Sequence, residues 1–175
     1  MKKIVLIVTV TVFTLTHLVA QDATFVKGNK VLDVGVGMGS ISSAWTPVFS
    51  ASFEAGIIDN IIKKGVIGVG GYLGYSSRTY AGWKRSNILI AGRGNFHYPL
   101  VKKMDTYAGL MIGWDVYSEK WKGEGSAPDH SSYGGFISTL FAGTSYYFSK
   151  NIAVMAELGL GYHLTYLDIG VSFKF

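Results

Sequence analysis

Seven acidic and basic residues lie in segments that alternate between large apolar and small or polar side chains, always on the side opposite the apolar one. Such groups can relay a proton or an ion, but buried charges need partners, so the same residues can equally form a closed electrostatic network. Arg93 and Lys174 are the bases available to the acids. We favour the structural network, whose members are Asp33, Glu54, Arg93, Asp115, Glu157, Asp168 and Lys174.

Two further patterns bear on catalysis and nucleotide binding. The segment His163-Leu164-Thr165 resembles the His-x-Ser element of outer-membrane lipid A deacylases and phospholipases, but Thr replaces Ser and no acid follows at a suitable place on the same face. We therefore expect His163 to be an ordinary residue of a connection between strands, at the rim of the fold, and we expect the protein not to be an enzyme. Gly35, Gly37 and Gly39 recur at every second position, so the Gly-x-Gly-x-x-Gly spacing of a dinucleotide site is missing. We expect no cofactor, and these glycines fit packing inside a narrow barrel.

Basic and aromatic residues occupy the connections between several of the alternating segments. At the rim of a membrane protein, such side chains can contact lipopolysaccharide phosphates or a host surface, and they can equally be generic interfacial anchors. The sequence leaves both interpretations open. The residues are Trp45, Arg78, Tyr80, Trp83, Lys84, Arg85, Lys120, Trp121 and Lys122.

Eight alternating segments position these residues. In the last one, Leu167, Ile169, Val171, Phe173 and Phe175 share one parity, which is the period of a β-strand. Each segment has about ten residues, the length at which a tilted strand crosses a bilayer. In the sixth segment both parities carry apolar groups, so its faces are not assigned. The first six expected strands cover 30–41, 49–57, 66–76, 87–98, 106–117 and 133–148, and the last two form a closing hairpin over 152–175.

The connections predict an orientation. Those at 42–46, 77–86 and 118–132 are polar and mostly long, whereas those at 59–65, 99–105 and 149–151 are shorter. Long loops outside and short turns in the periplasm are typical of outer-membrane barrels. The very short turn near 163–165 is an exception among the outer loops. An even number of strands places both termini in the periplasm, and we expect the last strand to pair with the first.

Composition distinguishes a membrane barrel from a soluble one. Hydrophobic residues make up 49% and charged residues 15% of the chain, well below the roughly 25% charged residues of a soluble domain. The face that carries Gly, Ser and a few ionisable groups is too sparse in charge to meet solvent, but it fits a narrow lumen. We therefore predict an all-β fold, an eight-stranded antiparallel transmembrane β-barrel, over a soluble barrel or a β-sandwich.

Export and charge narrow the function further. Residues 1–20 show the order of a secretory signal peptide, with Lys2 and Lys3, an apolar run and Ala20, which leaves 21–175 as the barrel. The chain has no cysteine, so disulfides and thiol catalysis are excluded. The net charge is +5, and its basic residues are scattered rather than gathered on one face, so we expect no nucleic-acid binding.

The export signal, the eight segments and the final strand LDIGVSFKF together resemble the small eight-stranded outer-membrane proteins of the OmpX/OmpA-like barrel type, the outer membrane β-barrel domain family. The resemblance implies a monomer in the cell outer membrane, surrounded by lipid and lipopolysaccharide, with Phe173 and Phe175 presented to the barrel-assembly machinery. It implies a non-enzymatic structural or surface-interaction role. A narrow porin-like channel and a lipid A-modifying enzyme remain as alternatives.

Overall fold

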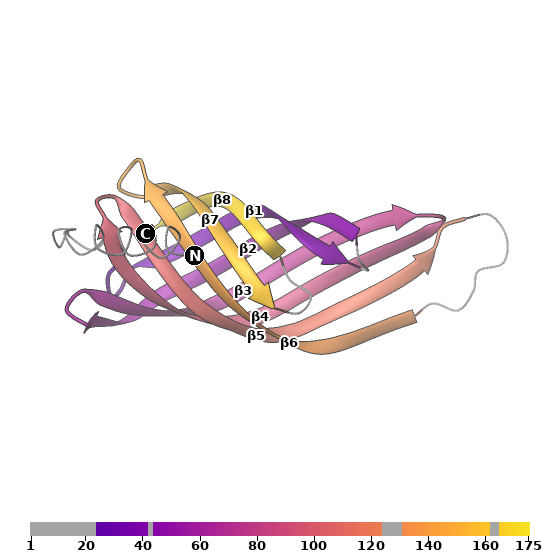
Figure 1. Cartoon of the computed structure of the whole chain (residues 1–175), viewed down its shortest axis with the longest axis horizontal. Coiled ribbons are helices and arrows are strands. Elements are labelled where there is room, and N and C mark those ends of the chain that lie inside the picture. Colours follow the sequence, from indigo (N-terminus) through magenta and orange to yellow (C-terminus); the bar gives the residue numbers. More distant parts are fainter. Residues whose placement is uncertain (1–23, 42–43, 124–130, 162–164) are drawn as a thin grey trace, which may run out of the picture.

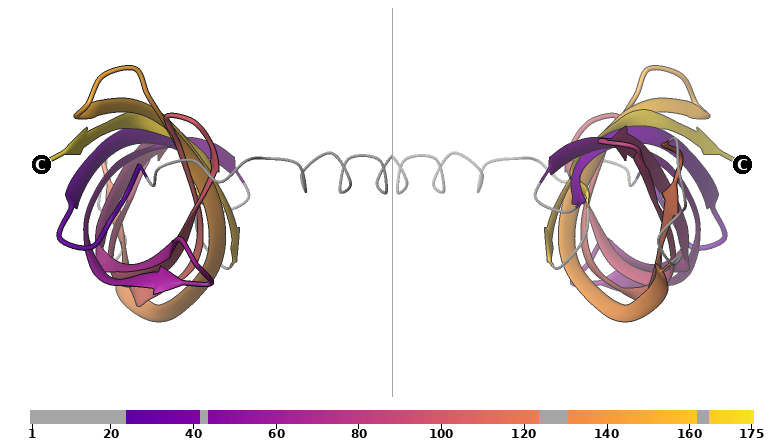
Figure 2. Two further views of the ribbon diagram at one scale, coloured as in Figure 1. Left: turned by 90° about the vertical axis from the view of Figure 1, so that its left-hand side faces the viewer. Right: turned by 90° about the vertical axis from the view of Figure 1, so that its right-hand side faces the viewer.

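The chain folds into a closed ring of eight antiparallel strands, in which each strand pairs with the next and β8 pairs with β1 (Figures 1 and 2). This computed structural model describes residues 24–41, 44–123, 131–161 and 165–175. It confirms the predicted eight-stranded barrel. No helix in these ranges is long and apolar enough to cross a membrane. The strands are β1 (Lys30–Ile41), β2 (Ala44–Ile61), β3 (Gly65–Tyr80), β4 (Trp83–Val101), β5 (Met104–Trp121), β6 (Ser131–Tyr147), β7 (Ile152–Gly161) and β8 (Thr165–Lys174).

The two ends of the barrel differ. We call the end with the β2–β3, β4–β5 and β6–β7 turns the terminal rim, because Thr24 and Phe175 also lie there. The opposite end, where β3 and β4 are joined, is the distal rim. The predicted signal peptide, residues 1–20, lies outside the described residues, and so does His163.

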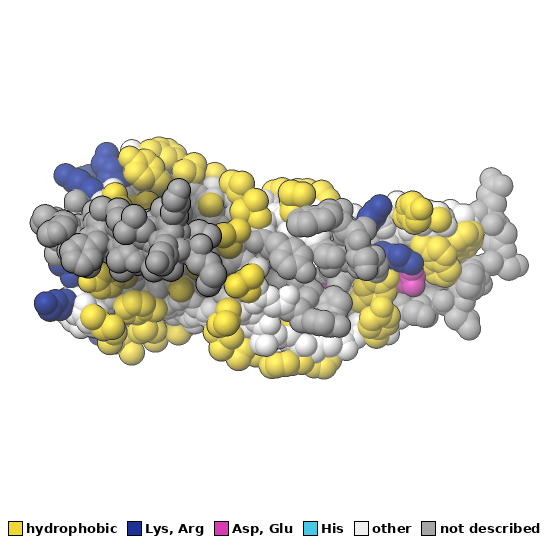
Figure 3. Space-filling view, in the orientation of Figure 1, with side chains coloured by type: hydrophobic (Ala, Val, Ile, Leu, Met, Phe, Trp, Pro, Cys, Tyr) yellow, Lys and Arg dark blue, Asp and Glu magenta, His cyan; other side chains and the backbone are white. Residues whose placement is uncertain are grey.

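Large apolar side chains point outward from every strand, because successive residues of a strand face opposite sides of the sheet. Phe49, Ile90 and Leu140 are each more than 60% exposed. In the space-filling view, apolar side chains cover much of the barrel wall, and Lys and Arg lie towards its two ends (Figure 3). An apolar exterior around a polar interior is the arrangement of a transmembrane barrel.

The structure assigns the faces of β6, which the sequence left open. Ile137, Phe141 and Tyr147 point into the barrel and are buried, whereas Leu140 and Tyr146 point outward. The lumen here accepts aromatic side chains because small residues lie opposite them: a Cβ added to Gly143 would meet the ring of Tyr107. The sequence could not assign the faces of β6 because both faces carry apolar side chains, so that apolar and polar residues do not alternate along the strand.

Strands β2, β3, β4 and β5 are longer than the sequence predicts. β3, β4, β5 and β6 have 16 to 19 residues, against 10 in β7 and β8, and they extend beyond their neighbours at the distal rim (Figure 1). The expected loop at 77–86 is therefore mostly strand, closed by Ala81 and Gly82. Both residues have positive φ angles, 48° and 79°, which a tight two-residue hairpin favours.

A row of four serines crosses these long strands. Ser77, Ser86, Ser118 and Ser132 are successive Cα partners in β3, β4, β5 and β6. They share the outward parity of the apolar band, so the band ends at this row. From this row outward the four strands form the projecting sheet, residues 77–80, 83–86, 118–121 and 131–132. We include 133–138 of β6 in it, because the β7-facing edge of this stretch pairs with no described strand: Gly161, the last residue of β7, pairs with Thr139.

Replacing Gly68 by valine tests the packing of the lumen, because a Cβ at this position would overlap the carboxylate of Glu54. Overpacking an interior costs about 1–3 kcal/mol, so Gly68→Val should lower the free energy of unfolding by that amount, measured by tryptophan fluorescence in urea. Gly94→Val is the control, since a Cβ there meets no described atom within 4 Å. Equal losses in both variants would contradict the packing described here.

Candidate functional site

Arg93 and Glu157 form a buried ion pair in the middle of the lumen. Arg93 Nη2 donates to Glu157 Oε2 at 2.7 Å, and the two side chains are 3% and 10% exposed. The guanidinium also lies 4.3 Å from the ring centre of Phe141. β4 and β7 are not neighbours in the sheet, so this pair spans the lumen and ties opposite walls together.

A second group joins three strands near the terminal rim. The two ring nitrogens of His97 lie 2.5 Å from Glu54 Oε1 and 2.9 Å from Asp105 Oδ2, and Asn95 donates to the other oxygen of Glu54. Because an ionised carboxylate only accepts hydrogen bonds, an imidazolium that donates from both nitrogens satisfies this arrangement. Its charge offsets those of the two acids beside it.

The remaining acids of the predicted set are held by neutral side chains. The hydroxyl of Ser52 donates to Asp33 at 2.9 Å, and that of Ser50 donates to Asp168 at 2.5 Å. Asn87 donates to Asp115 at 2.7 Å.

Lys174 also points inward, at the terminal rim, but none of the ion pairs between described residues includes it. Its ammonium instead donates to the backbone oxygen of Thr24 at 2.8 Å and lies 4.4 Å from the ring centre of Tyr147. The structure thus brings the predicted residues into several separate groups.

The sequence analysis did not place four of these residues in a network. Asn95 and His97 lie on the same face of their strand as Arg93, and this shared parity could have placed them in the lumen network. Asp105 was assigned to a turn. Phe25 falls in a polar segment and has no periodicity to reveal it, yet it is 2% exposed and stacks on His97 with ring centres 4.1 Å apart.

The segment before β1 covers the terminal end of the lumen. Gly28 donates to the backbone oxygen of Gly56 at 2.9 Å, and Gly56 donates to that of Asn29 at 3.0 Å. These bonds hold Phe25 over the His97 group. Deeper in the barrel, a cavity of about 10 Å³ between Met111, Glu157 and Asp168 has room for one water at most.

The projecting sheet has an inner face of arginines and aromatic rings. Arg85 pairs with Glu119 at 2.6 Å, the rings of Trp83 and Trp121 lie 5.2 Å apart, and Arg78 lies 5.5 Å from the ring centre of its neighbour Tyr80. Below them, the ring centres of Tyr117 and Tyr133 are 4.7 Å apart. The register places Tyr80, Trp83 and Trp121 in one row, and Arg78, Arg85 and Glu119 in the next.

The other predicted rim residues lie elsewhere. Lys84 and Lys120 are Cα partners on the outer face of the same sheet. Lys122 follows β5, and Trp45 belongs to β2, where its side chain lies outside the description. The residues expected on loops are thus divided by strand parity into two faces with different chemistry: the inner face carries the arginines and aromatics, and the outer face carries lysines.

The terminal rim is rich in lysine. The lysines there lie in the three turns, before and at the start of β1, and at the end of β8, and most are exposed. They are Lys27, Lys30, Lys63, Lys64, Lys102, Lys103, Lys150 and Lys174. Phe173 and Phe175, the predicted assembly signal, point outward at the same rim, and the backbone of Phe175 exchanges hydrogen bonds of 2.9 and 3.0 Å with Lys30.

Metal binding gains no support within the described residues, where no group of three or more His, Cys, Asp or Glu side chains is arranged to hold an ion. In sequence, the chain matches no protein-family model and no curated protein.

Solved structures of small outer-membrane barrels share the fold. Ail of Yersinia pestis, in complex with the heparin analogue sucrose octasulfate, has a TM-score of 0.57 at 12% identity, covering 85% of this chain and 99% of Ail. Neisserial surface protein A gives 0.58 at 13%, covering 83% and 94%. The N-terminal barrel of Pseudomonas aeruginosa OprF gives 0.55 at 15%, covering 85% and 98%. At these identities the likeness shows the fold, that of the OmpA/OmpX type, and nothing beyond it.

Neutralising Arg93 tests the ion pair across the lumen. Removing one partner of a buried pair leaves the other charge uncompensated, at a cost of about 3–5 kcal/mol. Arg93→Met should lower the free energy of unfolding by this amount in urea, and Arg93→Met/Glu157→Leu should recover part of it. Arg85→Met breaks an exposed pair of similar length and should change stability little. An unchanged stability of Arg93→Met would contradict the network.

Proposed function

We propose that the chain is a non-enzymatic, monomeric outer-membrane protein whose projecting sheet binds polyanionic saccharides at the cell surface. The inner face of that sheet carries the proposal, because it combines Arg78 and Arg85 with four aromatic rings. In this orientation the terminal rim faces the periplasm, and Phe173 and Phe175 serve as the signal for the barrel-assembly machinery.

The chemistry of the inner face fits an anionic sugar. A guanidinium offers planar, paired donors to phosphate or sulfate oxygens, and the rings of Trp83 and Tyr80 offer apolar surfaces beside them. Arg85 is 36% exposed, and Tyr80 and Tyr133 are more than 60% exposed. Because β7 and β8 are short, the sheet can be approached from their side. The ligand class covers lipopolysaccharide phosphates and the sulfated glycans of a host surface.

One comparison supports this ligand class. Ail, which shares the fold, is solved with a heparin analogue bound. The lumen gives no comparable support to the alternative of a solute channel, because Phe25 covers the His97 group and the Arg93–Glu157 pair crosses the barrel.

The two faces of the projecting sheet provide a matched binding test, with sucrose octasulfate as the probe. Arg78→Gln/Arg85→Gln removes two charges from the inner face and should weaken binding of the probe to the refolded protein about tenfold. A hydrogen bond to a charged group is worth about 1.5–3 kcal/mol, and solvent exposure at this face reduces that value. Lys84→Gln/Lys120→Gln removes two charges from the outer face of the same strands and should change affinity less than about threefold. Equal losses would assign binding to net charge rather than to this face.

Cysteine labelling tests the orientation, because the chain has no native cysteine. Lys84→Cys lies in the projecting sheet and Lys63→Cys in the β2–β3 turn. A membrane-impermeant maleimide should label Lys84→Cys in intact cells, and should label Lys63→Cys only after the outer membrane has been opened. The reverse pattern would place the projecting sheet in the periplasm and overturn the proposed role.

A further inference from the structure

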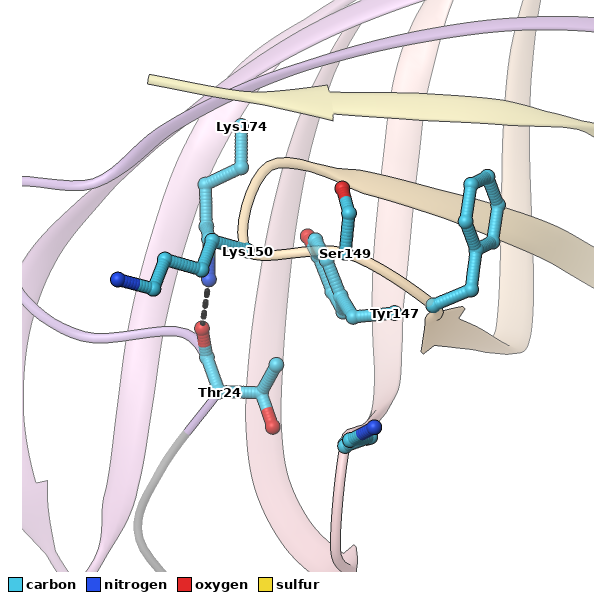
Figure 4. Close-up of a pocket in the computed structure, with 7 residues that line it drawn as sticks. Thr24, Tyr147, Ser149, Lys150 and Lys174 are labelled. Carbon is cyan, nitrogen blue, oxygen red and sulfur yellow. Dashed lines mark hydrogen bonds between the residues drawn. The ribbon is translucent and has the colours of Figure 1, made fainter.

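A pocket of about 530 Å³ lies at the terminal rim, at the opposite end of the barrel from the projecting sheet (Figure 4). Lys103 comes from the β4–β5 turn, Lys150 from the β6–β7 turn and Lys174 from the end of β8. Three segments that are separated in sequence therefore each contribute one lysine to the lining of the same cavity.

Hydrogen bonds fix the backbone that carries these lysines. The hydroxyl of Ser149 accepts from the backbone N–H groups of Asn151 and Ile152 at 3.3 and 3.0 Å, which closes the β6–β7 turn. Asn151 Nδ2 donates to the backbone oxygen of Lys174 at 2.5 Å. The N–H of Tyr147 donates to the backbone oxygen of Lys103 at 2.8 Å. The three lysines are thus carried on a bonded framework, which lowers the ordering cost of binding.

The pocket also contains hydrogen-bond donors without an acceptor among the described residues. An ammonium has three N–H donors, and that of Lys174 uses one of them on the backbone oxygen of Thr24 (Figure 4). The hydroxyl of Tyr147, a residue 3% exposed that lines the same pocket, has no hydrogen-bond partner among the described residues. Leaving a buried hydroxyl unpaired is unfavourable, so an acceptor that enters the pocket and reorients these groups is stabilised.

Negative charge does not already occupy the site. None of the ion pairs between described residues involves Lys103, Lys150 or Lys174. Asp105 acts on the Lys174 ammonium through space, and both Asp105 and Glu54 contact His97. The positive charges of Lys103 and Lys150 are therefore available to a ligand, beside that of Lys174.

We propose that this pocket binds a phosphate group, carried either by the headgroup of an anionic phospholipid or by a soluble phosphate ester. Several lysines around one cavity suit the compact, multiply accepting oxygens of a phosphate. Phe148, the residue that follows β6, also lines the pocket and is 57% exposed. An exposed aromatic ring beside the site can contact lipid headgroups, so a lipid can reach the site as directly as a soluble ester can.

The test uses the full barrel refolded in dodecyl maltoside, a detergent without phosphate. Glycerol 3-phosphate is titrated by calorimetry, and retention of phosphatidylglycerol or phosphatidylcholine is measured by native mass spectrometry. Lys103→Gln/Lys150→Gln should weaken binding at least tenfold. Lys27→Gln/Lys63→Gln removes the same charge from exposed positions of the same rim outside the pocket and should change binding less than twofold.

The outcomes separate the two sources. Retention of phosphatidylglycerol that glycerol 3-phosphate displaces supports a lipid headgroup, whereas binding of glycerol 3-phosphate without retention of either lipid supports a soluble ester. Equal losses in the two double variants, or no binding of any of these probes, would overturn the proposal. All four substituted lysines are exposed, so folding is preserved, and the faster migration of the unboiled barrel in SDS verifies it for each variant. The proposed surface role of the projecting sheet does not depend on the result.

Discussion

The structure depends on the closure of the ring between β1 and β8. In an apolar environment every backbone N–H and C=O must find its partner within the protein, and only a sheet without edges achieves this with strands. Here the first and last strands pair from Val31 with Lys174 to Met38 with Leu167, and mutual hydrogen bonds between Lys30 and Phe175 continue the pairing. Once the ring is closed, strand parity decides which side chains meet the exterior and which fill the lumen.

The narrow lumen explains the pairing of its charges. An eight-stranded barrel has an interior just wide enough for side chains, so Arg93 is held against Glu157 and Phe141 rather than by water. Glu54 and Asp105 are close enough to share His97. The same width requires small residues opposite large ones, as with Gly143 and Tyr107. The paired charges of the lumen therefore stabilise the wall, and both proposed binding surfaces lie at the rims.

The sequence predicted the architecture because parity is a local signal, and it predicted less wherever that signal fails. The faces of β6 were ambiguous because Phe141 fills the lumen while Leu140 faces outward. The projecting sheet was taken for loops because charged residues occupy both of its faces beyond the serine row, so that Lys84 and Arg85 show no alternation. The contacts of His97 with Asp105 and Phe25 join different strands and a terminal segment, and no short-range pattern reports such contacts.

Cross-linking across the β1–β8 seam tests the closed ring most directly. Val36 and Ile169 are Cα partners in this seam, and the chain has no native cysteine. With Val36→Cys/Ile169→Cys in native membranes, mild oxidation should join the two strands within one chain and change its mobility on denaturing gels, whereas the displaced pair Val36→Cys/Phe173→Cys should not react. Failure of the first pair to react, or cross-links only between separate chains, would contradict closure of the barrel by β1 and β8.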